Sequence, residues 1–319
     1  MTIYKKFHAR DPHSPAFLFH LLIRILLLLA AGGATAAAAP IPIAVSILPQ
    51  KHFVEKIAGE RVNVMVMVRP GASPALYEPR PGQMIKLHST AMYFAIGVPF
   101  EKTWLPRIVD LNPELPILHT EKGIQKMFME KHKHREDPEQ KKDFKQHMHD
   151  EKHKILDPHI WLDPKLVQIQ ARNILNGLKR VDPDHTQEYE RNFASFIAET
   201  TRISQEIRDI LAPIPVSGRT FMVFHPSWGY FARAYGLRQF PIESEGKEPG
   251  PAELARIIEQ GKRLKVRTVF VQKQFSTKSA ELIAHGMQAK VVLLDPLAEN
   301  WDENLLHAAR AIASALGDE

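Results

Sequence analysis

The sequence predicts an α/β protein in which two Rossmann-like lobes, each with a mainly parallel sheet, are joined by one long rigid helix. Two observations support this. Short apolar runs alternate with helical patterns in both halves of the chain, which is typical of βαβ units. Between the halves, residues 184–211 carry apolar side chains at three- and four-residue spacing, which predicts a helix of about 40 Å. We therefore expect an N-terminal lobe at 40–183, a linker helix at 184–212 and a C-terminal lobe at 213–319.

The first 39 residues have the pattern of an export signal. Lys5, Lys6 and Arg10 form a basic start, an apolar run covers 21–31, and small residues cover 34–39. The apolar run is too short for a convincing membrane span. We expect cleavage between Ala37 and Pro40 and a mature protein in the periplasm.

Composition excludes several classes of protein. The chain contains no cysteine, so it has neither disulfides nor a lipid-carrying N-terminal cysteine. The net charge is +6, and the leader carries four basic residues against one aspartate, which leaves +3 for the mature chain. An excess this small does not indicate nucleic-acid binding. The mature length suggests two domains, each able to bury its own core.

In the first half, strands and helices are expected to alternate. The expected strands are 41–48, 62–68, 92–96 and 115–118, and the expected helices are 53–57, 83–88 and 104–111. Ligands of such sheets bind outside the carboxyl ends of the strands, so the residues that follow each strand are the most informative.

The second half repeats this pattern four times. The expected strands are 221–224, 237–242, 268–271 and 290–294, and the expected helices are one ending at 235 and those at 251–264, 277–287 and 303–316. His225 directly follows the first of these strands, and Asp295 follows the last. Both residues are therefore expected at carboxyl ends.

The segment from Asp157 to Pro164 contains the first candidate metal ligand, His159. Prolines at 158 and 164 stiffen the backbone, and Asp163 is expected to cap a helix over 165–179. An isolated histidine in a strand-to-helix turn usually has no metal. Together with a second histidine, His225, and the carboxylate of Asp295, His159 becomes a candidate member of one set of metal ligands.

Residues 122–154 change abruptly to charged and polar types. We interpret this segment as a mobile loop, because it has too few apolar side chains to offset the entropy of ordering. A weak metal-collecting role and an ordinary solvated loop both remain open. The loop contains five histidines, namely His132, His134, His147, His149 and His153.

Eight segments carry a family resemblance and span nearly the whole mature chain. They are 47–49, 53–59, 70–74, 77–79, 157–164, 224–231, 243–249 and 294–297. Together these segments resemble the zinc- and manganese-binding (cluster A-I) solute-binding proteins of bacterial ABC importers. The resemblance implies a monomeric periplasmic receptor that holds a metal ion between its lobes and delivers it to an ABC permease.

The sequence departs from this family at Ala75, where the family has a ligand histidine within Ser-Pro-His-x-Tyr-Glu-Pro. His159 and His225 match other family histidines, and Asp295 lies in the region that can supply a carboxylate. Three interpretations follow. In the first, which we favour, zinc still binds through these three residues, and water or a neighbouring group completes a tetrahedron. In the second, the site no longer binds tightly, and the histidines of the mobile loop bind more of the metal. In the third, the cleft binds something other than zinc.

Two further residues are considered as substitute ligands. Glu78 lies on the same loop as Ala75, and His52 follows the first strand. The ordinary alternatives are a solvated carboxylate or helix cap for Glu78 and a core-facing ring for His52. We favour these alternatives over a ligand role for either residue.

The ligand types favour zinc over manganese, since manganese prefers oxygen-rich sites. Manganese-binding relatives also tend to have a carboxylate where this chain has His225. Asp157, Asp163 and Glu243 are candidate acceptors that orient the histidines, while Trp161, Trp228 and Tyr230 are expected to pack around the cleft. Binding should weaken as pH falls through the histidine range.

Other functions remain open. A periplasmic zinc chaperone or buffer, which exchanges zinc with another protein, is one alternative, and a manganese or iron receptor is another. A zinc hydrolase is less well supported, because the sequence has no Ser or Cys nucleophile motif, phosphate loop or His-Glu-x-x-His helix. We therefore do not expect an enzyme.

Overall fold

The computed structural model describes residues 39–129, 155–243, 249–275 and 277–317. All of the predicted export signal except Ala39 lies outside the described residues, and so do the five histidines of the predicted loop. Within the described ranges, no helix is both long enough and apolar enough to cross a membrane.

The first half of the chain forms a four-stranded sheet with the order β2-β1-β3-β4, in which all strand pairs are parallel. Its strands are β1 (Ile41–Val45), β2 (Val62–Val66), β3 (Met92–Ala95) and β4 (Ile117–His119). Its helices are α2 (Leu48–Ala58), α3 (Pro81–Lys86), α4 (Pro99–Leu111) and α5 (Pro164–Val181). The short 3-10 turn η5 (Ile160–Leu162) precedes α5.

The second half repeats the same arrangement, with the parallel order β6-β5-β7-β8. Its strands are β5 (Thr220–Val223), β6 (Arg238–Pro241), β7 (Thr268–Val271) and β8 (Lys290–Leu293). Its helices are α7 (Gly229–Ala234), α8 (Pro251–Arg263), α9 (Thr277–Met287) and α10 (Trp301–Gly317). The two sheets confirm the predicted α/β class with two lobes.

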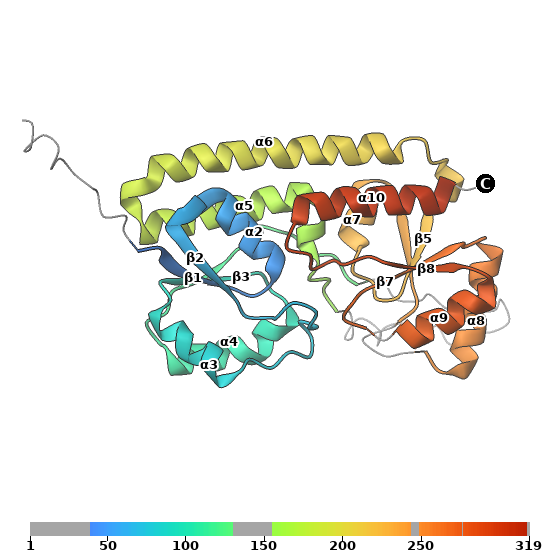
Figure 1. Ribbon diagram of the computed structural model, residues 1–319, viewed down its shortest axis with the longest axis horizontal. Coiled ribbons are helices and arrows are strands. Elements are labelled where there is room, and N and C mark those ends of the chain that lie inside the picture. The colour runs from blue at the N-terminus through green and yellow to red at the C-terminus, as the bar shows by residue number, and fades with distance from the viewer. Residues whose placement is uncertain (1–38, 130–154, 244–248, 276, 318–319) are drawn as a thin grey trace, which may run out of the picture. The chain divides into compact units, whose positions relative to one another are not determined.

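The long helix α6 (Thr186–Leu211) has 26 residues, and its apolar stripe includes Tyr189, Phe196, Ile203 and Leu211, all buried. This helix packs against α2 and α5, which belong to the first half, and against α10, which follows the last strand of the second half (Figure 1). The predicted connecting helix is therefore confirmed, and it is in contact with elements of both halves.

The expectation of two separate cores is wrong. The main cluster of buried side chains includes Ile43 in β1, Phe196 in α6, and Phe221 in β5 without a break, and residues 40–319 form one compact unit. A second, smaller cluster lies among β5, β7, α8 and α9. The halves share a core because the buried stripe of α6 contacts both.

Two tryptophans also join the halves. The indole N–H of Trp161 in η5 donates to the carbonyl of Pro296 at 2.6 Å, and that of Trp301 donates to the carbonyl of Trp161 at 2.6 Å. Both rings are 1% exposed. Since buried indole N–H groups need an acceptor, these contacts fix η5 against the start of α10.

The predicted start of the mobile loop, at residue 122, is too early. Residues 122–129 are described, and Phe128 forms an antiparallel bridge with Leu156. The amide of Met129 also donates to the carbonyl of Ile155 at 2.8 Å. The apolar side chains of Ile124 and Met127, scattered among charged neighbours, pack against the main core, which the average composition of this stretch did not indicate.

Candidate metal-binding site

His159 lies at the residue before η5, with Asp163 and Pro164 following as predicted. The Asp163 carboxylate accepts the amide of Lys165 at 2.9 Å and so caps α5, and Pro164 occupies the first turn. The His159 residue is 8% exposed. A capped helix on one side and Pro158 on the other hold this imidazole in a rigid segment.

His225 follows β5, as predicted, and its side chain is 18% exposed. Its backbone is fixed by Gln272, whose side chain accepts the His225 amide at 3.2 Å and donates to the His225 carbonyl at 2.8 Å. The imidazole is stacked on Phe275, with ring centroids 4.8 Å apart. His225 therefore sits at the carboxyl end of its strand with both its backbone and its ring held.

The structure brings the two histidines together from opposite halves of the chain. Their ring centroids are 5.4 Å apart, and the rings are inclined at 72°. Two imidazoles that bind one zinc ion tetrahedrally, each at about 2.0–2.1 Å, have centroids separated by about 5 Å. The observed pair is thus spaced so that both rings can ligate one ion.

A buried carboxylate accompanies each imidazole. Nδ1 of His159 lies 2.7 Å from Asp157 Oδ1, and Nδ1 of His225 lies 3.0 Å from both oxygens of Glu243. Both carboxylates are 1% exposed. Because carboxylates accept hydrogen bonds, each Nδ1 carries the proton, and the lone pair of each Nε2 is left for a metal ion.

The protonation of His159 is also influenced by its surroundings. Burial lowers the pKa of His159, and the charge and hydrogen bond of Asp157 oppose this effect only in part. The neutral imidazole, which is the form that binds metal, is therefore favoured at neutral pH.

Of the three predicted orienting carboxylates, two have the expected contact. Asp157 and Glu243 are each bonded to a histidine, whereas the Asp163 carboxylate caps α5. Trp161 packs against His159 with ring centroids 5.2 Å apart. Trp228 and Tyr230 are both fully buried.

Asp295 follows β8, at the same edge of the sheet as His225, but β7 lies between their strands. Its Oδ1 accepts the amide of Leu297 at 2.9 Å and the side chain of Gln274 at 3.2 Å. Its Oδ2 lies 3.8 Å from Nζ of Lys273. In the described part of the chain, no three His, Asp or Glu side chains converge closely enough to hold a metal ion, so Asp295 does not join the histidine pair in this conformation.

The loop with Ala75 is at the surface. Ala75 and Glu78 are both exposed, and Leu76 is 84% exposed. The amide of Ala75 donates to the hydroxyl of Ser73 at 3.3 Å, so a short local turn holds this position. Glu78 is thus exposed to solvent on this loop, where a solvated carboxylate was the alternative to a ligand role.

His52 is not brought to the histidine pair. It lies on α2 among Phe53, Phe196 and Trp301, with ring centroids 6.2 to 6.3 Å away. Its Nε2 is buried without a hydrogen bond and lies 3.9 Å from Asp302. Since the helix begins at Leu48, position 52 falls on the face of α2 that packs against α6 and the ring of Trp301. This corrects the suggestion that His52 reaches the cleft.

Sequence reasoning missed Gln272 and Phe275, which hold His225. Both follow β7, the strand next to β5, so the rule that residues at carboxyl ends matter most could have found them. Their residue types gave no signal, because a glutamine and a phenylalanine in a loop are common and bind no metal.

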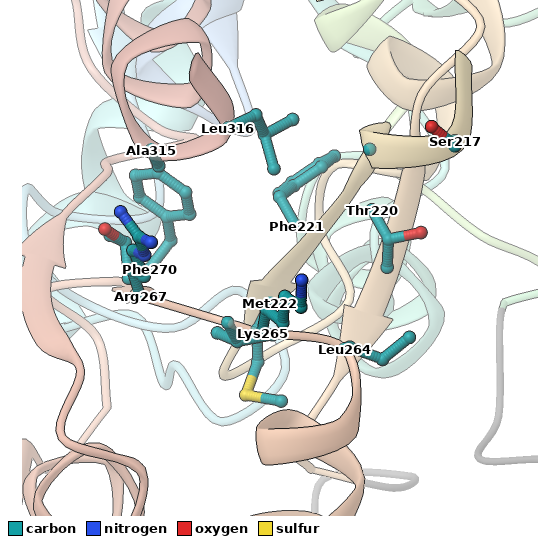
Figure 2. A pocket seen from close by; sticks show the side chains of 13 residues that line it. Ser217, Thr220, Phe221, Met222, Leu264, Lys265, Arg267, Phe270, Ala315 and Leu316 are labelled. Carbon is teal, nitrogen blue, oxygen red and sulfur yellow. The ribbon is translucent and has the colours of Figure 1, made fainter. Parts of the chain in front are cut away.

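A cavity of about 490 Å³ lies elsewhere, at the amino ends of β5 and β7 (Figure 2). Phe221, Phe270 and Leu316 form part of its wall, together with the basic residues Lys265 and Arg267. It is on the edge of the sheet opposite to His225, and its two cationic side chains would repel a metal ion. This cavity is therefore not the candidate metal site.

The chain is similar to known proteins over most of its length. The family described as ZnuA, zinc-uptake complex component A, periplasmic, matches residues 43–316. The high-affinity zinc uptake system protein ZnuA of Bacillus subtilis is 25% identical over 259 residues, covering 80% of this chain and 78% of that protein. The manganese-binding lipoprotein MntA of Halalkalibacterium halodurans is 27% identical over 221 residues, covering 69% of this chain and 66% of that protein.

A solved structure has a similar fold. The crystal structure of a ZnuA deletion mutant with zinc bound matches with a TM-score of 0.76 and 42% sequence identity. The match covers 87% of this chain and 98% of that one.

Proposed function

Since this chain belongs to the ZnuA family of periplasmic zinc-uptake components, we propose that it is an extracytoplasmic receptor that captures Zn(II) and delivers it to an ABC permease. The observation that carries the proposal is the meeting of His159 and His225, 5.4 Å apart between ring centroids, with a buried carboxylate on each Nδ1. Two imidazoles at this spacing, each with its Nδ1 bonded to a carboxylate, can supply half of the ligands of a tetrahedral zinc site.

Asp295 is the proposed third ligand, and water completes the tetrahedron because Ala75 offers no donor atom. For this to happen, Asp295 must exchange its contacts with Gln274 and Lys273 for the metal ion. Its position at the same sheet edge as His225 supports the proposal. Glu78 is the substitute that the exposed loop allows, whereas His52 lies among aromatic rings away from the histidine pair.

Zinc is the proposed cargo because imidazole nitrogens suit zinc, and a site with two of them is poor in the oxygen ligands that manganese prefers. The manganese-binding relative keeps a manganese or iron receptor as the second candidate. No catalytic role is proposed, since the site serves reversible binding of the ion.

The remaining parts of the proposal concern the setting of the protein. Residues 1–39 are proposed as a cleaved export signal, and the lobes as 40–183 and 213–319 with the connecting helix at 184–212. The mature protein is proposed to be a periplasmic monomer. Transfer of zinc to or from a metallochaperone, or service as a zinc buffer, is the alternative to delivery to a permease.

Calorimetric titration with zinc tests the proposed site. The proteins are the mature chain from residue 40, a version without residues 130–154, and the variants Ala75→His and Asp295→Asn. Since Met129 and Ile155 are hydrogen-bonded neighbours, an Asn-Gly turn can close the deletion without removing Met127 or Phe128.

We expect the deletion to keep tight binding, Ala75→His to tighten it, and Asp295→Asn to weaken it. Loss of all binding on deletion would place the principal site in residues 130–154. Unchanged affinity in Ala75→His would show that the loop position is not a vacant ligand position. Tight binding of an organic solute, with none of any divalent ion, would contradict the whole proposal.

Uptake measurements separate the receptor from the chaperone. Vesicles that contain the permease and its ATPase should accumulate zinc only when the loaded protein is present. If zinc passes instead to an apo-metalloenzyme and never into the vesicles, the delivery role is wrong.

A further inference from the structure

Tyr230 connects the two halves of the chain next to the histidine pair. It lies on α7, in the same segment as His225, and it is fully buried. Its hydroxyl accepts the amide N–H of Met127 at 2.9 Å and donates to the carbonyl of Asp157 at 3.1 Å. The amide of Asp157 in turn donates to the carbonyl of Met127 at 2.8 Å. One phenol from the second half thus closes a ring of three hydrogen bonds with two residues of the first.

The hydroxyl of Tyr230 is suited to both roles. Burial raises the pKa of Tyr230 to about 12, so the oxygen keeps its proton and can donate to Asp157 while it accepts from Met127. The hydroxyl therefore gives a partner to the carbonyl of the buried Asp157 and to the amide of the partly buried Met127, and the three hydrogen bonds hold the backbone of Asp157 in one position.

The side chain of Asp157 is held by other groups. Its Oδ1 accepts the backbone amide of His159 at 2.9 Å as well as Nδ1 of the same residue. Its Oδ2 approaches α7 so closely that a Cβ on Gly229 would lie only 2.9 Å away. Gly229 and Tyr230 therefore accommodate the carboxylate and fix the backbone of the same residue.

We propose that Tyr230 is a positioning residue for metal capture: its hydroxyl holds the backbone of Asp157 so that the carboxylate meets Nδ1 of His159. This inference rests on the proposed function. The consequence is that a single short segment, 225–230, supplies one imidazole and orients the other. A shift of Asp157 would release the Nδ1–H tautomer of His159 and turn its Nε2 away from the ion.

The test is Tyr230→Phe, which removes the hydroxyl and keeps the ring. The variant is made in the mature protein lacking residues 130–154, so that only the cleft is titrated. We expect the zinc affinity to fall about tenfold, the lower end of the range for partners of ligating groups. The matched control is Tyr235→Phe, which removes another buried hydroxyl near the end of α7, bonded to Ser204 on α6 at 3.3 Å. Its zinc affinity should equal that of the parent.

A double-mutant cycle identifies the path of the effect. If Tyr230 acts through Asp157, the losses in Tyr230→Phe and Asp157→Asn are not additive. In the metal-free protein, the ring ¹⁵N shifts of His159 should also move from the Nδ1–H tautomer toward the other one in Tyr230→Phe. A role confined to stability would leave that tautomer unchanged.

The outcomes distinguish this inference from the proposed function. Parent-like zinc affinity in Tyr230→Phe, additive losses in the cycle, or an unchanged His159 tautomer would overturn the role of Tyr230. A parent protein that binds no zinc would overturn the proposed function instead. If Tyr230→Phe does not fold, Gly229→Ala tests whether the position of Asp157 controls zinc affinity, because the added Cβ would lie 2.9 Å from the Asp157 carboxylate. Unchanged affinity in that variant would contradict the inference.

Discussion

The imidazoles of His159 and His225 each rely on a carboxylate buried in their own half of the chain. Asp157 and Glu243 are both 1% exposed, so burial of each carboxylate is costly unless it has partners, and Nδ1 of a histidine is one partner of each. The same contact that satisfies the carboxylate sets the tautomer of the imidazole. In each half, one contact between a histidine and a carboxylate therefore serves both the burial of charge and the proposed binding of the metal ion.

His52 gives a prediction about pH. Burial lowers the pKa of His52, opposed in part by Asp302, so the unfolded chain binds a proton more readily than the folded one. The contribution of the neutral ring to stability is present above the unfolded pKa of about 6.5 and is lost as pH falls through the lower folded value. His52→Phe should therefore flatten the fall in the free energy of unfolding between about pH 7 and pH 5.

Urea unfolding of the metal-free protein measures this effect. At neutral pH the variant should be more stable by about 1 kcal/mol, because the unpartnered Nε2 is gone from a site among aromatic rings. Its zinc affinity should be that of the wild type. If the free energy of unfolding depends on pH as in the wild type, His52 is not the titrating group. If the variant binds zinc more weakly than the wild type, His52 is a metal ligand after all.

At the scale of elements, α5 places the His159 segment by packing closely on β3. Gly177 is the point of contact, since a Cβ there would lie 2.8 Å from the sulfur of Met92 and would also collide with the ring of Phe94. The helix can approach the sheet only where this side chain is absent.

Gly177→Ala should destabilise the protein by about 1–3 kcal/mol through overpacking. Gly82 in α3 is the matched control, because a Cβ at that position meets no atom within 4 Å. Gly82→Ala should be neutral or stabilise by up to about 1 kcal/mol. Urea unfolding at neutral pH measures both. If the two variants have the same free energy of unfolding, an added methyl group at position 177 does not disturb the packing of α5 on β3.

Most elements could be predicted from the sequence, because apolar periodicity and proline or glycine punctuation agree locally. Strand β7 and helix α9 have the predicted bounds, and Gly59 ends α2 with a φ of 61°. The first strand was predicted to reach Leu48, but it ends at Val45, because the proline at 49 starts a helix. Such boundaries depend on backbone geometry that periodicity does not specify.

At the scale of the whole molecule, the halves share one core. The buried stripe of α6 contacts α2 and α5 in one half and α10 in the other, and the indole of Trp301 is bonded to Trp161 across the halves. Separating the halves would expose this apolar surface and leave buried polar groups without partners. The shared core therefore restricts any movement of one half relative to the other.

The shared core predicts that residues 40–319 unfold in one cooperative transition. Differential scanning calorimetry of the metal-free protein should give equal calorimetric and van't Hoff enthalpies. Two separated transitions, or a calorimetric enthalpy far above the van't Hoff value, would show that the lobes fold independently, as the sequence first suggested.

The candidate site could be predicted only in part. His159 was identifiable because prolines flank its segment just before a helix, and His225 because it follows a strand at the carboxyl end of its sheet. The meeting of the two residues depends on how η5 packs beside α7. That packing comes from long-range contacts such as Tyr230 with Asp157, which no local pattern encodes. The position of Asp295 at the sheet edge was also predictable from the sequence. Its contacts with Gln274 and Lys273, which hold it away from the histidines, were not.

The central claim is that His159 and His225 bind the same zinc ion, and X-ray absorption spectroscopy tests it directly. The sample is the mature protein without residues 130–154, loaded with one equivalent of zinc. The account predicts scattering from two imidazoles at about 2.0–2.1 Å, and loss of one imidazole in either His159→Gln or His225→Gln. A spectrum without imidazole ligands, or one that neither substitution changes, would contradict it.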